Sequence, residues 1–89
     1  MKMIRAFIRP EKEQEIVLAL EGAGFPSLTK MPVFGLPKTL VMMVVEDSEV
    51  DKVINLIQDK ARTGFIGDGK IFVSPVEASY TVRTGEAVL

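Results

Sequence analysis

Residues 63–70 read TGFIGDGK and lead directly into IFVSP at residues 71–75. A pattern typical of an amphipathic helix ends near Arg62, and the apolar run after the loop is typical of a strand. Glycine allows positive φ angles and close backbone approach, so successive N–H groups of this loop can converge on an anion, and Lys70 adds a positive charge. The stretch therefore predicts a helix-loop-strand unit whose loop can hold phosphate.

The same loop also has a plain structural interpretation. Gly64 can be the residue that ends the preceding helix, and residues 67–69 can form a tight turn into the strand. Neither the dinucleotide-binding fingerprint nor the Walker spacing is present. On spacing alone, the plain turn is the favoured interpretation.

The composition predicts one small domain over residues 1–89, with no internal linker. Apolar residues make up 47% of the chain, which is high for so small a domain, so we expect part of this surface to meet another subunit. The net charge of −1 and the scattered Lys and Arg residues argue against nucleic-acid binding. The absence of Cys and His excludes disulfides, thiolate nucleophiles, imidazole bases and the usual zinc ligands.

Hydropathy gives no indication of membrane insertion. The longest apolar run, residues 40–45, is too short to span a bilayer, and residues 1–5 lack the apolar core of a signal peptide. We therefore expect a soluble, cytoplasmic protein.

Periodicity predicts alternating strands and helices along the chain. We expect strands at residues 3–9, 25–34, 38–45, 71–76 and 79–83, helices from Pro10 to Gly22 or Gly24 and from Ser48 to Arg62, and a tail over residues 84–89. The first six elements have the order strand, helix, strand, strand, helix, strand. This order predicts an α+β, ferredoxin-like βαββαβ sandwich with an antiparallel sheet and both helices on one face.

Two local features refine this prediction. Ser48 and Asp51 stand at capping-box spacing at the start of the second helix. The strand at residues 38–45 has no polar residue beyond Thr39, so both of its faces should be covered. Helices can cover one face, which leaves the other for a partner subunit.

Two motifs resemble signatures of the PII signal-transduction family. Residues 62–73, RTGFIGDGKIFV, resemble the family's B-loop signature, and VRTGE at residues 82–86 resembles its C-terminal signature at the expected distance. The resemblance extends over residues 1–86. It implies a homotrimer that binds ATP or ADP in clefts between subunits and senses 2-oxoglutarate through MgATP.

Softer similarities favour the branch of this family that accompanies nitrogenase genes. They are RPEK at residues 9–12, GFP at residues 24–26 with LTK at residues 28–30, FVSPVE at residues 72–77, and YTVRTGE at residues 80–86. This resemblance implies that the protein regulates nitrogenase together with a paralogous PII subunit.

The family's binding residues carry over onto matching positions here. Gly67, Asp68, Gly69 and Lys70 are expected to hold the phosphates, and Arg83 to reach them from a neighbouring subunit, while Thr81 replaces a second arginine. Thr29 and Val44 match positions at the adenine, Gly35 lies beside the nucleotide, and Lys38 matches a lysine that contacts 2-oxoglutarate. The alternatives are a core residue for Val44 and a solvated strand-end lysine for Lys38. No catalytic residue and no metal ligand is assigned.

One departure from the family pattern concerns its long T-loop. Phe34-Gly35 runs directly into Leu36-Pro37-Lys38, so the T-loop is missing between Gly35 and Leu36. A loop removed by design or left unrecorded is favoured over a naturally short connection. In the family this loop contacts partner proteins. The main prediction is a non-enzymatic regulator; the alternatives are a trimeric scaffold with impaired ligand binding, or a slow ATPase.

Overall fold

The computed structural model describes residues 1–35 and 37–88, so the predicted connection at Leu36 lies outside the described residues. The elements, in chain order, are β1 (Lys2–Ile8), η1 (Pro10–Lys12), α1 (Glu13–Gly22), β2 (Thr29–Val33), β3 (Lys38–Val45), η2 (Asp47–Glu49), α2 (Val50–Ala61), β4 (Gly69–Pro75), β5 (Ser79–Tyr80) and β6 (Ala87–Val88). No helix among these elements is long and apolar enough to cross a membrane.

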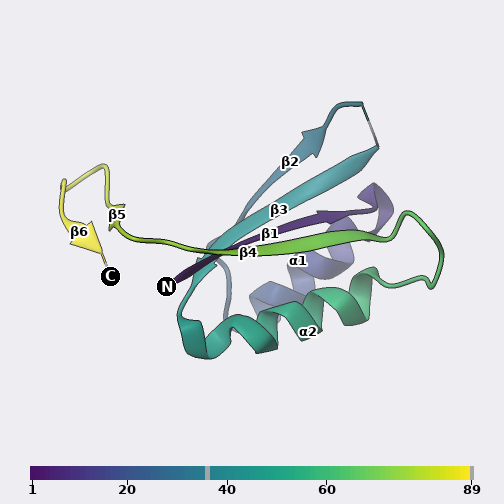
Figure 1. Cartoon of the computed structure of the whole chain (residues 1–89), viewed down its shortest axis with the longest axis horizontal. Coiled ribbons are helices and arrows are strands. Elements are labelled where there is room, and N and C mark those ends of the chain that lie inside the picture. Colours follow the sequence, from purple (N-terminus) through teal and green to yellow (C-terminus); the bar gives the residue numbers. More distant parts are fainter. Residues whose placement is uncertain (36, 89) are drawn as a thin grey trace.

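The first four strands form one antiparallel sheet in the order β2-β3-β1-β4. Both α-helices lie on the same face of this sheet (Figure 1). The prediction of an α+β, ferredoxin-like sandwich is therefore confirmed. Strands β5 and β6 pair only with each other and form a small hairpin beyond the end of β4.

Alternation along the central strands builds the core between sheet and helices. In β1, Ile4, Ala6 and Ile8 are buried, and the register places Ile4 opposite Met43 and Ala6 opposite Val41 of β3. The helices complete this cluster with the following buried residues: Ile16 and Leu20 from α1, and Val53, Ile57 and Ala61 from α2. Removing these side chains from water is the main force that fixes both helices on one face.

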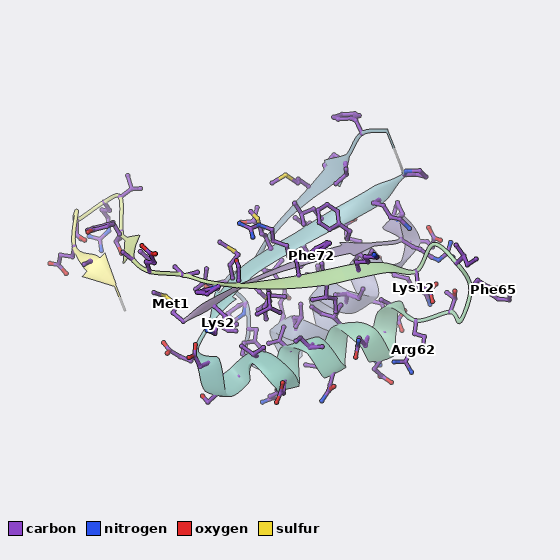
Figure 2. All side chains as sticks on the ribbon, in the orientation of Figure 1. Met1, Lys2, Lys12, Arg62, Phe65 and Phe72 are labelled. Carbon is purple, nitrogen blue, oxygen red and sulfur yellow. The ribbon has the colours of Figure 1, made fainter. Side chains whose placement is uncertain are left out.

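The opposite face of the sheet is open in the single chain. Arg5 lies opposite Met42 on one side and Phe72 on the other, and the rings of Phe7 and Phe72 meet edge to face at 6.0 Å. Phe72 is 52% exposed and Val44 40% exposed. As expected, the helices cover one face of residues 38–45 (Figure 2), and the covering of the other face by a partner subunit stays a prediction.

The second predicted strand begins later than expected. Residues 25–28 are not part of β2, because the Phe25 N–H donates to the Leu20 carbonyl at 2.9 Å and the Leu28 N–H donates to the Pro26 carbonyl at 3.1 Å. The first bond closes the end of α1, and the second forms a turn in the segment that follows. Phe25 instead packs against the core from outside the sheet.

The predicted capping box at Ser48 and Asp51 does not form. Glu49 precedes α2 in a helical conformation without a side-chain cap, because η2 already continues the chain into the helix. Asp47 instead accepts a hydrogen bond from the ammonium of Met1 at 2.6 Å, which ties the N-terminus to the start of this segment.

The predicted tail contains a strand. β6 pairs with β5, and the turn between them is closed by hydrogen bonds from the Thr81 N–H to the Glu86 carbonyl at 2.9 Å and from the Gly85 N–H to the Thr81 carbonyl at 2.7 Å. The expected strand at residues 79–83 is correspondingly shortened to two residues. Leu89 lies outside the described residues.

Candidate functional site

The loop of residues 62–68 connects α2 to β4 and is shaped by its glycines. Arg62 leaves the helix in an extended conformation, and Gly64, Gly67 and Gly69 then adopt positive φ angles of 90°, 104° and 111°. At Gly69 the requirement is absolute, since an added Cβ would lie 1.7 Å from the carbonyl oxygen of Phe7. Glycine there lets the start of β4 lie directly against β1.

Asp68 ties the loop to itself. Its carboxylate accepts hydrogen bonds from the backbone N–H groups of Thr63 at 2.8 Å and Gly64 at 2.9 Å, and from the Thr63 hydroxyl. The Thr63 hydroxyl, these N–H groups and the Arg9 guanidinium hold the pKa of the Asp68 carboxyl far below its ordinary value. The carboxylate is therefore charged and fully engaged, which disfavours a role as general acid, base or metal ligand.

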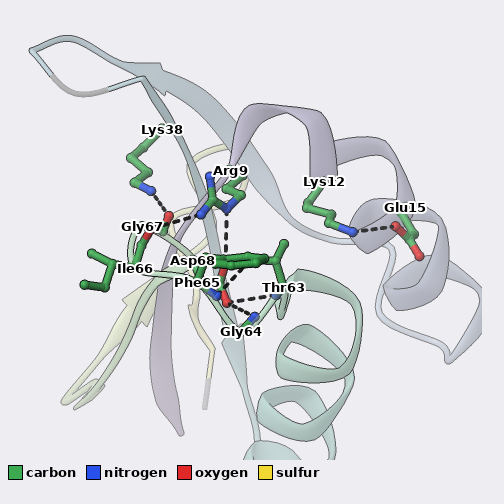
Figure 3. Close-up of polar contacts among 10 residues, drawn as sticks. All are labelled: Arg9, Lys12, Glu15, Lys38, Thr63, Gly64, Phe65, Ile66, Gly67 and Asp68. Atoms are coloured by element: carbon green, nitrogen blue, oxygen red, sulfur yellow. Dashed lines mark hydrogen bonds and ion pairs between the residues drawn. The ribbon is translucent and has the colours of Figure 1, made fainter.

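Two cationic side chains from outside the loop, Arg9 and Lys38, contact it. Arg9 donates through Nε to Asp68 Oδ1 at 3.1 Å and through Nη2 to the Ile66 carbonyl at 3.1 Å. Lys38, at the start of β3, donates to the Gly67 carbonyl (Figure 3). The carbonyl groups of Ile66 and Gly67 thus face cationic side chains.

The N–H groups of the same turn are left open. Within residues 1–35 and 37–88, the backbone N–H groups of Ile66 and Gly67 donate to no protein acceptor. Lys70 follows immediately and forms no ion pair with any described residue. Unpaired N–H groups beside a free ammonium form an arrangement that can hold a phosphate or carboxylate.

A hollow of about 330 Å³ lies next to this loop, between α2 and β4. Asp68, Gly69 and Lys70 line one side, and Gln58 and Arg62 come from the end of α2. Apolar residues form the rest of its wall: Phe7, Ile8, Ile54, Ile57, Ala61 and Ile71. The loop therefore borders space that a ligand can enter.

Two of the other predicted binding residues, Val44 and Thr29, lie farther from the loop along the sheet. Val44 pairs with Met3 near the start of β1, whereas Lys70 pairs with Phe7 near its end. Thr29 begins β2 opposite Met42. Val44 lines a second hollow, of about 420 Å³, together with Gly24, Phe25, Pro26, Ser27, Met43 and others.

Arg83 is the predicted residue most remote from the loop. It lies in the exposed turn between β5 and β6, and Figure 1 shows this hairpin on the opposite side of the molecule from the loop before β4. Gly35, with a φ of 97°, stands at the tip of the β2–β3 hairpin on the loop's side. The structure thus brings Lys38 and residues 67–70 together, and leaves Thr29, Val44 and Arg83 apart from them.

Sequence reasoning assigned no role to Arg9 or Thr63, the two side chains that bind the Asp68 carboxylate. Nothing in the pattern around Arg9 marks a partner 59 residues away. The only sequence signal for the Thr63–Asp68 contact was that the two residues lie five positions apart in a glycine-rich loop. Among the residues that the structure describes, no group of three or more acidic side chains is arranged to hold a metal ion.

Comparison with known proteins adds the family. Residues 33–86 match the model of the family described as nitrogen regulatory protein P-II. The chain belongs to the P-II family. Its match to this model covers the loop, Lys38 and Arg83 in one continuous segment.

Relatives of this P-II chain come from methanogenic archaea. It is 49% identical over 102 aligned positions to the "Nitrogen fixation nifHD region GlnB-like protein 1" of Methanothermobacter marburgensis, covering 97% of each chain. It is 51% identical over 100 positions to a protein of the same description from Methanococcus maripaludis, covering 94% of this chain and 95% of the relative. The nitrogen-regulatory, nitrogen-fixation-associated character expected from the sequence is thereby confirmed.

A solved P-II structure shares the fold. The crystal structure of Arabidopsis thaliana PII bound to citrate matches with a TM-score of 0.90 and 41% identity, over 98% of this chain and 84% of the other. The archaeal alignments exceed the 89 residues of this chain in length. The relatives therefore contain residues that have no counterpart here.

Proposed function

We propose that this protein is a cytoplasmic nitrogen regulator that binds ATP or ADP between the subunits of a homotrimer, senses 2-oxoglutarate and acts on nitrogenase. One observation carries the proposal: the residues expected at the nucleotide form two incomplete halves at separate ends of one chain. A site divided in this way is completed when the loop end of one subunit meets the hairpin end of the next. Head-to-tail contacts that close a ring give cyclic symmetry of this kind.

The loop half suits the phosphates. The open N–H groups of Ile66 and Gly67 supply donors, and Lys70, which pairs with Phe7 on the sheet face away from the helices, supplies a charge that forms no ion pair with a described residue. Gly67, Asp68 and Gly69 contribute through their backbone, since the Asp68 carboxylate is already engaged.

The opposite half suits the base. The 420 Å³ hollow beside Val44 has apolar walls from Phe25, Pro26 and Met43, as is usual in pockets that hold flat aromatic ligands. Thr29 lies on the neighbouring strand, and Arg83 stands on the protruding hairpin, where it can reach across to the phosphates of the adjoining subunit. Gly35 would lie beside the nucleotide at the tip of the β2–β3 hairpin.

The open sheet face supports the trimer. Phe72, Val44 and Met31 leave a substantial apolar area exposed on the side away from the helices. Large exposed apolar patches of this kind are typical of subunit interfaces. Three such faces meeting around one axis would bury this patch.

Lys38 is proposed to contact 2-oxoglutarate. Its ammonium lies at the loop, on the Gly67 carbonyl, and thus close to where the nucleotide phosphates and their magnesium would sit. Citrate, another carboxylate, is bound by the Arabidopsis PII to which this chain is similar. A carboxylate effector would pair with the Lys38 ammonium.

The proposed target of the protein is nitrogenase, which it is proposed to regulate together with a paralogous PII subunit. The names of the archaeal relatives place them in nitrogen fixation regions. The residues that those relatives have in excess are proposed to form a T-loop between the positions of Gly35 and Leu36. A chain without it is expected to bind ligands and to lack the contacts with its target.

Calorimetric titration of MgATP into the purified protein, with and without 2-oxoglutarate, tests this function. The expected result is saturable binding near one ATP per chain by a species whose mass in light scattering is that of a trimer. A folded trimer that binds no nucleotide would instead be the scaffold. ATP turnover above background, abolished in an Asp68→Asn variant, would support the ATPase.

A further inference from the structure

We propose that Arg9 is a positioning residue for the anion-binding loop: it holds the turn at residues 66–68 in the conformation that presents its N–H groups, without itself binding the anion. This inference rests on the proposed nucleotide site and deepens it. It assigns a role to Arg9, which is not among the nucleotide-binding residues expected from the sequence.

Arg9 stands on a rigid base. It directly follows β1, and the next residue, Pro10, begins η1 and restricts Arg9 to an extended conformation, observed at φ −63° and ψ 135°. The side chain is 25% exposed, so its direction is fixed by neighbouring atoms. Strand β1 lies in the middle of the sheet between β3 and β4. The guanidinium is thus anchored to the most constrained part of the fold.

The guanidinium spans the turn. Its Nε and Nη2 atoms bind Asp68 and the carbonyl of Ile66, two residues apart, each at 3.1 Å. Gly67 lies between them, and a Cβ at this position would come within 3.2 Å of Nη2. The planar, multidentate donor set of arginine suits such a two-point contact, which a lysine ammonium cannot reproduce.

These contacts orient the peptide groups of the turn. Arg9 holds the Ile66 carbonyl and Lys38 holds the Gly67 carbonyl (Figure 3), which restricts the peptide planes of the turn, and the N–H groups of Ile66 and Gly67 donate to no acceptor among the described residues. Asp68 in turn accepts hydrogen bonds from the N–H groups of Thr63 and Gly64, so the start of the loop is held by the same network of contacts. The charge of Arg9 is meanwhile matched by Asp68, whereas Lys70 forms no ion pair with any described residue.

A rival explanation is that Arg9 attracts the anion simply through its charge. The two explanations differ in their expectation for Asp68→Asn. Removing a negative charge near the site should tighten anion binding if charge alone matters. If the Arg9–Asp68 contact positions the loop, the same substitution should weaken binding.

The first experiment measures the loop in the absence of nucleotide, by amide hydrogen exchange in the intact oligomer. Arg9→Gln and Arg9→Lys are both expected to speed exchange of the Thr63 and Gly64 amides, by about 10-fold. Lys12→Gln is the matched control, because Lys12 pairs with Glu15 at 3.9 Å and does not contact the loop. Unchanged protection in both Arg9 variants would overturn the proposal.

The second experiment measures ATP affinity for the same variants and for Asp68→Asn. We expect Arg9→Gln, Arg9→Lys and Asp68→Asn each to weaken binding about 10-fold, and the Arg9→Gln/Asp68→Asn double variant to be no weaker than the singles, as for residues that act as one unit. Tighter binding by Asp68→Asn, or full rescue by Arg9→Lys, would overturn the positioning role. If the wild-type chain binds no nucleotide, the proposed function fails, while the exchange experiment still decides whether Arg9 holds the loop.

Discussion

The Nε atom of Arg9 lies 3.1 Å from Oδ1 of Asp68, and this ion pair joins residues 59 positions apart. It connects the end of the central strand β1 to the loop before β4. Asp68 in turn binds the N–H groups at the start of that loop. The shape of the candidate binding loop is therefore set by the sheet as well as by its own glycines.

The free ammonium of Lys70 leads to the first prediction. Lys70→Ala is expected to weaken ATP binding by about 10-fold or more, because a charged hydrogen bond contributes about 1.5–3 kcal/mol. Calorimetry gives the affinity, and light scattering checks that the oligomer is intact. Lys12→Ala, which removes a lysine remote from the loop, serves as the control. Equal affinities for both variants would remove Lys70 from the site.

Gly69 and Gly22 form a matched pair for the second prediction. Gly69→Ala should destabilise the protein by about 2 kcal/mol or more, since it combines a left-handed φ with a backbone clash against Phe7. Gly22→Ala, in α1, meets nothing within 4 Å and should stabilise by about 0.5–1 kcal/mol. Urea unfolding at one protein concentration measures both. A neutral Gly69→Ala would contradict the close packing of β4 on β1.

The sequence predicted the sheet well because its central strands carry strong local signals. The bounds of β3 agree with the prediction, since Lys38–Val45 is a continuous apolar and β-branched run between turn residues. The predictions failed where a tertiary contact replaced a local rule. Phe25 closes the end of α1 by bonding Leu20 instead of extending β2, and Asp47 pairs with the N-terminus.

The sequence predicted where the loop of the candidate site lies along the chain, but not which distant residues contact it. Gly67, Gly69 and Lys70 follow a recognisable motif, so the place of the candidate anion-binding turn is readable from the chain. The contact of Arg9 with Asp68 is not, because sequence spacing holds no information on a partner brought near by the β1–β4 pairing. The separation of Val44 from Lys70 likewise appears only once the strand register is known.

Acid should reduce the contribution of the Asp68 carboxylate to the free energy of unfolding. Its pKa in the folded protein is lowered, chiefly by the Thr63 hydroxyl, so the stabilisation is complete above the unfolded value of about 3.9 and is lost as the pH falls through the folded pKa. The stability difference between wild type and Asp68→Asn should therefore stay constant near neutral pH and shrink below about pH 4. Urea midpoints from pH 7 to pH 3 measure it. A difference that grows on acidification would contradict the assignment.

The apolar sheet face gives a prediction about assembly. Phe72→Glu should dissociate the oligomer, because it places a charge on the face proposed to be buried between subunits. Leu18→Glu is the control, since Leu18 is similarly exposed, at 59%, but belongs to α1 on the helical side. Light scattering of the two folded variants distinguishes them. Loss of the oligomer with Leu18→Glu alone would assign the interface to the helices.

The division of the site between two subunits can be tested by complementation. In the proposed homotrimer, Lys70→Ala would damage the loop half of the site and Arg83→Ala the hairpin half, so each variant alone should bind ATP weakly. When the two variants are unfolded together and reassembled, about one site in four should combine an intact loop from one subunit with an intact hairpin from the next, as cyclic head-to-tail contacts require. Calorimetry should then recover a fraction of tight sites that neither variant shows alone. If each site were contained within one chain, mixing would restore nothing, because every chain would carry one damaged half.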